Sequence, residues 1–147
     1  MRTLILTMAA LAGLLMIYAK SAPAAGPSQN VLDTGSRLYG DSCGSCHGAD
    51  GAGVPGDSPP MQNDPLVTGN PVTLIRVMTQ GTAKITSQQE KSLYTNTMPA
   101  DYHLSDDQIA ALLTYMRHDF GGNASPITAD QVTQVRKQYG GFDSNQP

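Results

Sequence analysis

Residues 43–56 read C-G-S-C-H-G-A-D-G-A-G-V-P-G and contain both cysteines of the 147-residue chain. Cys43 and Cys46 are three positions apart, and His47 directly follows the second. This arrangement occurs in four chemical settings: a covalent haem site, a zinc site, a redox-active dithiol and a short-range disulfide. The rest of the sequence separates these four possibilities.

The C-x-x-C-H spacing is the attachment signature of c-type haem. Thiols three residues apart project from one helical turn toward the two vinyl groups of a porphyrin, and the adjacent imidazole then reaches the iron. We therefore predict one covalently bound haem c. Cys43 and Cys46 would form the thioether bonds, and His47 would be an axial iron ligand.

The three other settings fit the sequence less well. A structural zinc site needs four protein ligands, and the remaining histidines, His103 and His118, are not in a paired spacing. A thioredoxin-like dithiol would follow a strand in a βαβ context, and no such pattern precedes the motif. A disulfide between positions three apart would close a very short loop and stabilise little.

The N-terminal residues have the pattern of an export signal. Arg2 precedes the apolar run 4–19, and Ala22-Pro23-Ala24 matches an A-x-A cleavage site. We predict that residues 1–24 are a signal peptide and that the protein is periplasmic, because bacteria attach haem covalently outside the cytoplasm. The apolar run is shorter than the roughly 17–25 residues that span a bilayer. Lys20 directly after it keeps an uncleaved membrane anchor as the alternative.

The charge of the predicted mature chain argues against a nucleic-acid partner. Without Arg2 and Lys20, seven basic residues stand against twelve acidic ones, a formal charge of −5. Binding to a phosphate backbone relies on lysine and arginine contacts, which this balance does not favour. The acidic residues are scattered, which is typical of a solvated surface.

Capping signals and hydrophobic periodicity predict an all-α fold. Ser105 with Gln108, and Thr128 with Gln131, form two capping boxes, each followed by an amphipathic pattern. The helices predicted from these signals and from two weaker patterns cover approximately residues 31–43, 71–80, 105–120 and 128–139.

Two long connections separate these helices, at residues 48–70 and 82–104. Structureless loops of more than about 15 residues are uncommon in compact domains, because ordering them costs entropy. A large apolar ligand packed between them would offset that cost. It would also supplement a core that has no tryptophan and only two phenylalanines. We therefore predict that both loops wrap the haem.

The second axial ligand decides between electron transfer and oxygen or peroxide chemistry. Met98 is late in the second connection, and Pro99 stiffens the chain directly after it. We predict Met98 as this ligand. Met61 and His103 stay open as alternatives.

The sequence resembles the class I c-type cytochromes over roughly residues 30–122. The likeness is carried by Gly35 and Tyr39, C-G-S-C-H-G at 43–48, T-M-P-A at 97–100 and L-S-D-D-Q-I-A-A-L-L-T-Y-M-R at 104–117. It implies a small cytochrome c domain in residues 25–122, with Tyr39 among the haem-binding residues. The first helix would cross the last near Gly35, Tyr39, Leu112 and Tyr115. Residues 123–147 would be a C-terminal extension with one amphipathic helix.

The same resemblance implies how the imidazole is held. In class I relatives a proline carbonyl of the first loop accepts the ring N–H, which turns the other nitrogen toward iron. Pro59 or Pro60 would serve here. More narrowly, H-G-A-D-G-A-G-V-P-G at 47–56 and L-T-Y-M-R at 113–117 are similar to the cytochrome subunits or partners of quinoprotein alcohol and sugar dehydrogenases.

These features together predict an electron-transfer protein and not an enzyme in its own right. It would carry one electron at a time from a dehydrogenase, such as a quinoprotein, to a downstream cytochrome or terminal oxidase. Two alternatives stay open. One is a haem subunit of a membrane-bound dehydrogenase or oxidase complex, and the other is a ligand-binding or peroxidase-like haem protein with a labile sixth site.

Overall fold

All regular secondary structure in the described part of the chain is helical. The computed structural model describes residues 26–84, 97–100 and 103–140. Its elements are α2 (Gln29–Ser42), α3 (Gly44–His47), α4 (Pro65–Thr68), α5 (Pro71–Gln80), the 3-10 turn η1 (Thr82–Lys84), α7 (Asp106–Asp119) and α8 (Ala129–Tyr139). Among these residues there is no strand, only an isolated bridge between Val54 and Ser58. The all-α prediction is confirmed.

The helix starts follow the predicted capping signals. Ser105 Oγ accepts from Gln108 N at 3.3 Å, and Gln108 Oε1 accepts from Ser105 N at 2.9 Å, which completes the box before α7. Thr128 and Gln131 make the same reciprocal pair before α8. Such boxes satisfy donors that the first helical turn leaves unpaired. Both helices therefore begin where the sequence predicts.

One helix inside the first long connection was not predicted. Asp64 caps α4 by accepting from Leu66 N at 2.7 Å, and Pro65 is the first helical residue. Asn70 and Pro71 form the same kind of helix start at α5, and that helix was predicted. Residues 48–70 are thus less irregular than expected. The predicted signal peptide, residues 1–24, lies outside the described residues.

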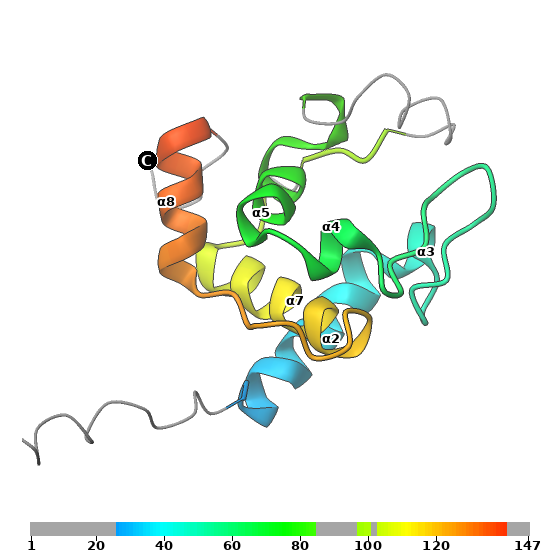
Figure 1. Ribbon diagram of the computed structural model, residues 1–147, viewed down its shortest axis with the longest axis horizontal. Helices are drawn as coiled ribbons and strands as arrows, with labels where there is room; N and C mark the ends of the chain where they lie inside the picture. Colours follow the sequence, from blue (N-terminus) through cyan, green and yellow to red (C-terminus); the bar gives the residue numbers. More distant parts are fainter. Residues whose placement is uncertain (1–25, 85–96, 101–102, 141–147) are drawn as a thin grey trace, which may run out of the picture.

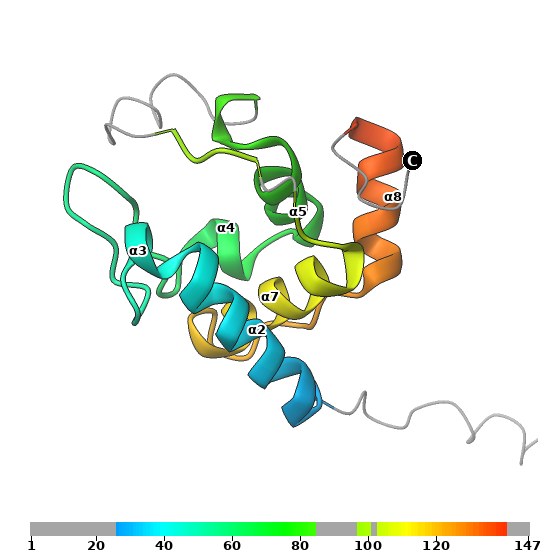
Figure 2. The same ribbon diagram turned by 180° about the vertical axis from the view of Figure 1, so that it is seen from behind.

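The close crossing of α2 and α7 is the central contact of the fold (Figures 1 and 2). A Cβ on Gly35 would lie 2.3 Å from the carbonyl oxygen of Ala111 and 2.5 Å from Tyr115 Cβ. The two backbones can approach this closely only because Gly35 has no side chain. The crossing lies near the residues that the family resemblance implied.

An aromatic cluster extends the crossing toward the cysteine motif. The Tyr39 ring centroid lies 5.9 Å from that of Tyr115 and 4.9 Å from that of Phe120. Tyr115 and Phe120 are 5.6 Å apart in an edge-to-face arrangement. Such geometries are favourable for aromatic pairs beyond the area they bury. The cluster fixes the end of α2 against the end of α7.

Arg117 ties the first long connection to α7. Its side chain is buried, and Nη1 donates to the carbonyl oxygens of Val67 at 2.6 Å and Gly69 at 3.0 Å. Its Nε donates to Ser125 O at 2.7 Å. Burial lowers the pKa of the Arg117 guanidinium, and the three carbonyls provide partial negative charge in place of a carboxylate. The end of α4 is therefore anchored to the last helix of the cytochrome-like region.

Helix α8 packs into the same core as the other helices. Ile127, Val132 and Val135 are buried in one hydrophobic cluster with residues of α2, α5 and α7. Figure 1 shows α8 beside α5 and the start of α7, and both contacts are made. The predicted amphipathic helix is present, and its apolar face is covered by the domain itself.

The Gly35 contact predicts opposite effects for two glycines of α2. A Cβ at Gly40 would meet nothing within 4 Å. Gly40→Ala should therefore raise the free energy of unfolding by about 0.5–1 kcal/mol, the usual gain in a helix interior. Gly35→Ala should lower it by about 2 kcal/mol or more, because two backbones must separate. Chemical denaturation followed by circular dichroism measures both, and equal effects would contradict a backbone contact at Gly35.

Candidate haem-binding site

The cysteine motif lies where α2 ends and α3 begins. Cys43 N donates to Tyr39 O at 2.8 Å, and His47 N donates to Cys43 O at 2.9 Å, so the chain stays helical through the motif. Cys43 and His47 are buried, whereas Cys46 is exposed. Neither cysteine is part of a disulfide. The backbone thus places two thiols and an imidazole within one turn, and the short-range disulfide is not formed.

The imidazole of His47 has a defined tautomer. Its Nδ1 lies 3.0 Å from the carbonyl oxygen of Pro59. A carbonyl can only accept, so Nδ1 carries a proton, and in the neutral ring Nε2 is then the nitrogen with the lone pair. Of the two prolines named from the sequence, Pro59 makes this contact, and Pro60 is exposed.

A glycine of the first loop positions the Pro59 carbonyl. Gly53 has a φ of +71°, and its N donates to His47 O at 2.8 Å. A Cβ on Gly53 would lie 2.6 Å from Ser58 O and from the carbonyl carbon of Pro59. The loop therefore folds back on itself, so that the residues before and after the turn both contact His47.

Tyr39 connects α2 to the residue after the histidine. Its hydroxyl donates to Gly48 O at 2.7 Å. Burial of the ring raises the pKa of the Tyr39 phenol to about 12, with smaller contributions from Cys43, Tyr115 and Asp50. The phenol therefore stays protonated, and able to donate, at any physiological pH.

Met98 is held by the residues that follow α5. Met98 N donates to Thr82 Oγ1, and Thr82 N donates to Met98 O, each at 3.0 Å. Gly81 has a φ of +75°, and a Cβ there would lie 2.8 Å from Met98 O. The half-buried Met98 side chain also packs against the hydrophobic core. The backbone of Met98 is thus fixed on the end of α5.

The two alternative ligands named from the sequence are in different surroundings. Met61 is buried within the core cluster, and its N donates to Gly51 O at 2.8 Å. His103 is exposed and lies shortly before the start of α7.

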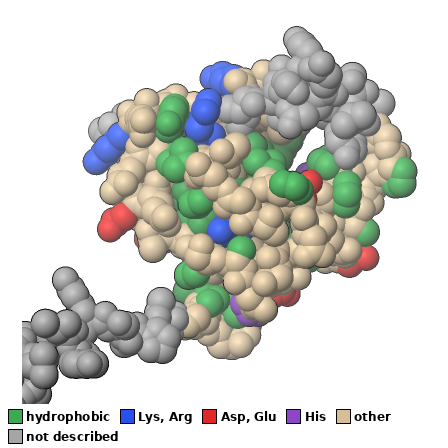
Figure 3. Space-filling model, in the orientation of Figure 1, with side chains coloured by type: hydrophobic (Ala, Val, Ile, Leu, Met, Phe, Trp, Pro, Cys, Tyr) green, Lys and Arg blue, Asp and Glu red, His purple; other side chains and the backbone are tan. Residues whose placement is uncertain are grey.

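A hollow lies between the two candidate ligand segments. In the space-filling view hydrophobic side chains lie along the described side of this hollow (Figure 3), in the region where α3 and residues 97–100 face each other in Figure 1. A porphyrin needs apolar walls, two thiols and soft or imidazole axial donors. The residues present supply each of these, so the donor set fits a c-type haem.

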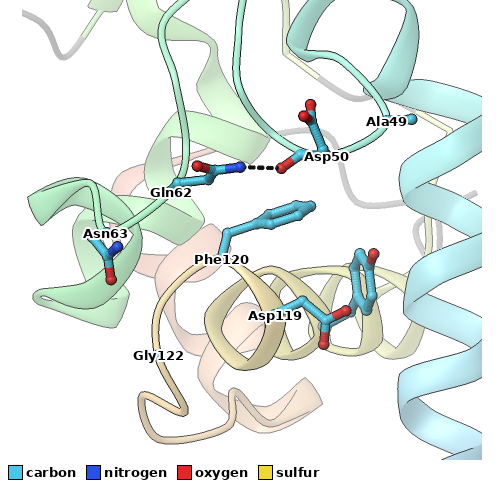
Figure 4. Close-up of a pocket in the computed structure, with 8 residues that line it drawn as sticks. Ala49, Asp50, Gln62, Asn63, Asp119, Phe120 and Gly122 are labelled. Atoms are coloured by element: carbon cyan, nitrogen blue, oxygen red, sulfur yellow. Dashed lines mark hydrogen bonds between the residues drawn. The ribbon is translucent and has the colours of Figure 1, made fainter.

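A separate pocket lies behind the first loop. It has a volume of about 470 Å³, and Asp50, Gln62, Asp119 and Phe120 are among its lining residues (Figure 4). Gln62 Nε2 donates to Asp50 O at 2.8 Å across its edge. Neither the cysteines nor His47 lines it. Within the described ranges, no group of three or more His, Cys, Asp or Glu residues is placed to hold a metal ion.

Comparison with known proteins identifies the family. The cytochrome c family profile matches residues 32–119. This chain belongs to the cytochrome c family. Its cofactor is therefore a covalently attached haem c with iron, and cytochrome c domains transfer electrons without making or breaking substrate bonds.

Three curated relatives within this family are cytochrome subunits of dehydrogenases. The cytochrome c subunit of a quinone-dependent alcohol dehydrogenase from Gluconobacter oxydans (strain 621H) is 31% identical over 71% of this cytochrome. The gluconate 2-dehydrogenase cytochrome c subunit of Pantoea cypripedii is 33% identical over 71% of it. The fructose dehydrogenase cytochrome subunit of Gluconobacter japonicus is 34% identical over 69% of it. The chain spans about a quarter of the length of these relatives, 22%, 24% and 22% respectively.

The contacts that hold the two candidate ligands, His47 and Met98, were not visible in the sequence analysis. Gly53 lies against the carbonyls of Ser58 and Pro59 later in its own loop, Gly81 lies against Met98 O, and Thr82 pairs with a residue 16 positions later. The signals available were Gly53 within a glycine-rich loop and Gly81 as a helix terminator. Neither signal specifies its partner.

The Gly53 contact predicts a difference between two loop glycines that both have a positive φ. Gly56 has a φ of +77°, and a Cβ there would meet nothing within 4 Å. Gly56→Ala should cost about 1 kcal/mol of unfolding free energy, the penalty for a left-handed alanine. Gly53→Ala should cost about 1–3 kcal/mol more, because its methyl group displaces the Pro59 carbonyl. Urea denaturation of the haem-containing protein measures both, and equal losses would contradict this role of Gly53.

Proposed function

We propose that this cytochrome is a periplasmic, single-haem electron carrier, in which Cys43 and Cys46 bond the haem and His47 and Met98 are its axial ligands. The observation that carries the proposal is the contact between His47 Nδ1 and Pro59 O, which fixes the ring and leaves Nε2 available to coordinate iron. When bound, the haem supplies a ferric–ferrous couple that takes up and releases one electron.

The role of His47 follows from its surroundings. A buried ring with its N–H held by a carbonyl cannot rotate or change tautomer without losing that hydrogen bond. The same bond increases the basicity of the opposite nitrogen, which strengthens its interaction with a metal. Pro59 therefore orients the ligand and adjusts its strength.

The role of Met98 is to set the potential. A thioether is a soft ligand that favours the reduced metal, so a histidine–methionine pair raises the midpoint potential. The two hydrogen bonds with Thr82 hold the methionine backbone in one position. Little rearrangement should then accompany electron transfer.

The exposure of the two cysteines suggests where electrons enter and leave. Cys43 is 7% exposed, whereas Cys46 is exposed to solvent. The haem edge bonded to Cys46 would therefore face a partner protein. Lys84 is also exposed.

The donor that we propose is a dehydrogenase of a small alcohol or sugar-derived substrate. The proposal rests on the names of the three relatives, which are cytochrome subunits of alcohol, gluconate and fructose dehydrogenases. The acceptor would be another cytochrome or a terminal oxidase. We place the protein in the periplasm because of the export pattern in residues 1–24. No helix in the described ranges has both the length and the apolar character needed to cross a bilayer.

Replacing the proposed methionine ligand tests this assignment. Met98→His should leave haem attachment intact and lower the midpoint potential by at least about 60 mV, a tenfold change in a one-electron equilibrium. Potentiometric titration measures it. Met61→Leu is the matched control, because Met61 is a buried core residue and its replacement should leave the potential nearly unchanged.

Carbon monoxide binding distinguishes a carrier from a ligand-binding haem protein. The reduced native protein should resist carbon monoxide, and Met98→Ala should bind it readily. Rapid binding by the native protein, or a potential that responds to Met61 and not to Met98, would contradict the proposed ligand set.

A further inference from the structure

Helix α8 contacts one residue at each end of the connection that carries Met98: Gln80, which directly precedes the connection, and Leu104 within it. This connection joins α5 to α7, and residues 81–84, 97–100 and 103–105 of it are described. The cytochrome c family profile ends at residue 119, so α8 lies beyond the matched region. Its contacts are therefore additional to those of the family domain.

At the first end, Gln80 joins α5 to the end of α8. Gln80 Nε2 donates to Tyr139 O at 2.5 Å and to Gly140 O at 3.1 Å. The last carbonyls of a helix have no partner within it, so one glutamine satisfies two oxygens at this terminus. The Arg76 guanidinium lies 4.5 Å from the centre of the Tyr139 ring, which adds a cation–π contact between the same helices.

Gln80 directly precedes the residues that hold Met98. Gly81 lies against Met98 O, and Thr82 exchanges two hydrogen bonds with the Met98 backbone. A shift at the end of α5 would therefore be transmitted to Met98 through two covalently adjacent residues.

At the second end, Arg136 joins α8 to the start of α7. Arg136 Nη2 donates to Leu104 O at 3.1 Å, six residues after Met98. Arg136 Nη1 lies 2.8 Å from Asp106 Oδ1 in a buried ionic contact, and the Thr133 hydroxyl donates to the same carboxylate. The Arg136 and Asp106 side chains are 3% and 11% exposed. Removing one partner of a buried ion pair destabilises the fold, because the other charge is left buried and unpaired. Arg136 and Asp106 therefore hold α8 firmly at the start of α7.

We propose that α8 is a positioning element for the Met98 ligand: by holding Gln80 and Leu104, it fixes both ends of the connection that carries the thioether. The inference rests on the proposed role of Met98 at iron. Fixing both ends lowers the entropy that the free connection would gain on releasing its ligand. The methionine is then harder for an external ligand to displace.

Displacement of the thioether by imidazole tests the proposal in the haem-containing protein. The first variant is Gln80→Ala, which removes the two hydrogen bonds to the end of α8 and the one that Gln80 accepts from Arg76 within α5. The second is Arg136→Lys, which keeps the charge beside Asp106 but has no second nitrogen for Leu104 O. Gln134→Ala is the matched control, because Gln134 is an exposed glutamine of α8. Imidazole binding to the ferric protein is read from the loss of the near-infrared absorption of a thioether–iron bond, and thermal unfolding is recorded alongside.

The expected result is that Gln80→Ala and Arg136→Lys each raise the imidazole affinity roughly 2- to 10-fold, corresponding to the loss of one or two hydrogen bonds. Gln134→Ala should leave the affinity unchanged. A purely structural role for α8 would lower the unfolding temperature of Gln80→Ala without changing the imidazole affinity, and this result would overturn the proposal.

Met98→Ala separates this inference from the proposed function. If Met98→Ala abolishes the near-infrared band while the α8 variants bind imidazole as the native protein does, only the positioning role fails. If Met98→Ala leaves the band unchanged, the ligand assignment fails and the positioning proposal with it.

Discussion

The contact of Gly35 with α7 is the constraint on which the rest of the structure depends. At this point the α2 backbone lies against Ala111 O with no space for a methyl group. Tyr39 and Cys43 follow Gly35 at intervals of four residues, so they lie on the same side of α2. The crossing therefore determines the position of the C-x-x-C-H motif. The aromatic cluster of Tyr39, Tyr115 and Phe120 fixes the direction in which α2 leads into that motif.

The segments that carry the two proposed axial ligands are held by the same physical device. In each case a glycine with positive φ lies where a Cβ would meet a backbone carbonyl: Gly53 against Pro59, whose carbonyl oxygen holds the His47 ring, and Gly81 against Met98 itself. Each also has a directed hydrogen bond, from His47 to Pro59 O and from Met98 N to Thr82. Close backbone contact and a hydrogen bond together restrict a loop far more than either alone. Long loops can thus present ligands with little freedom.

The sequence was sufficient to predict features that are determined locally. The capping boxes at Ser105 and Thr128 specify their helix starts because all partners lie within three residues. The C-x-x-C-H motif is equally local, whereas the family was given by the resemblance of several motifs over roughly residues 30–122, and the family profile confirms it. The start of α4 was missed although Asp64-Pro65 carries the same signal as Asn70-Pro71. Its short length left no hydrophobic period to detect.

Features that depend on distant partners could not be read from the sequence. Arg117 reaches Val67 O across 50 positions, and Gln80 reaches Tyr139 O across 59. Nothing in the local pattern of a helical arginine or glutamine specifies which carbonyl it will meet. The packing of α8 into the core has the same origin, since its amphipathic face predicts burial but not the surface that covers it.

The covalent state of the two cysteines tests the central claim most directly. The purified protein is denatured, treated with a thiol-alkylating reagent and analysed by intact-mass spectrometry. The account predicts the mass of the polypeptide plus one haem, with no alkylated cysteine, because both sulfurs are bonded to the porphyrin. A haem-free polypeptide that carries two alkyl groups would contradict it.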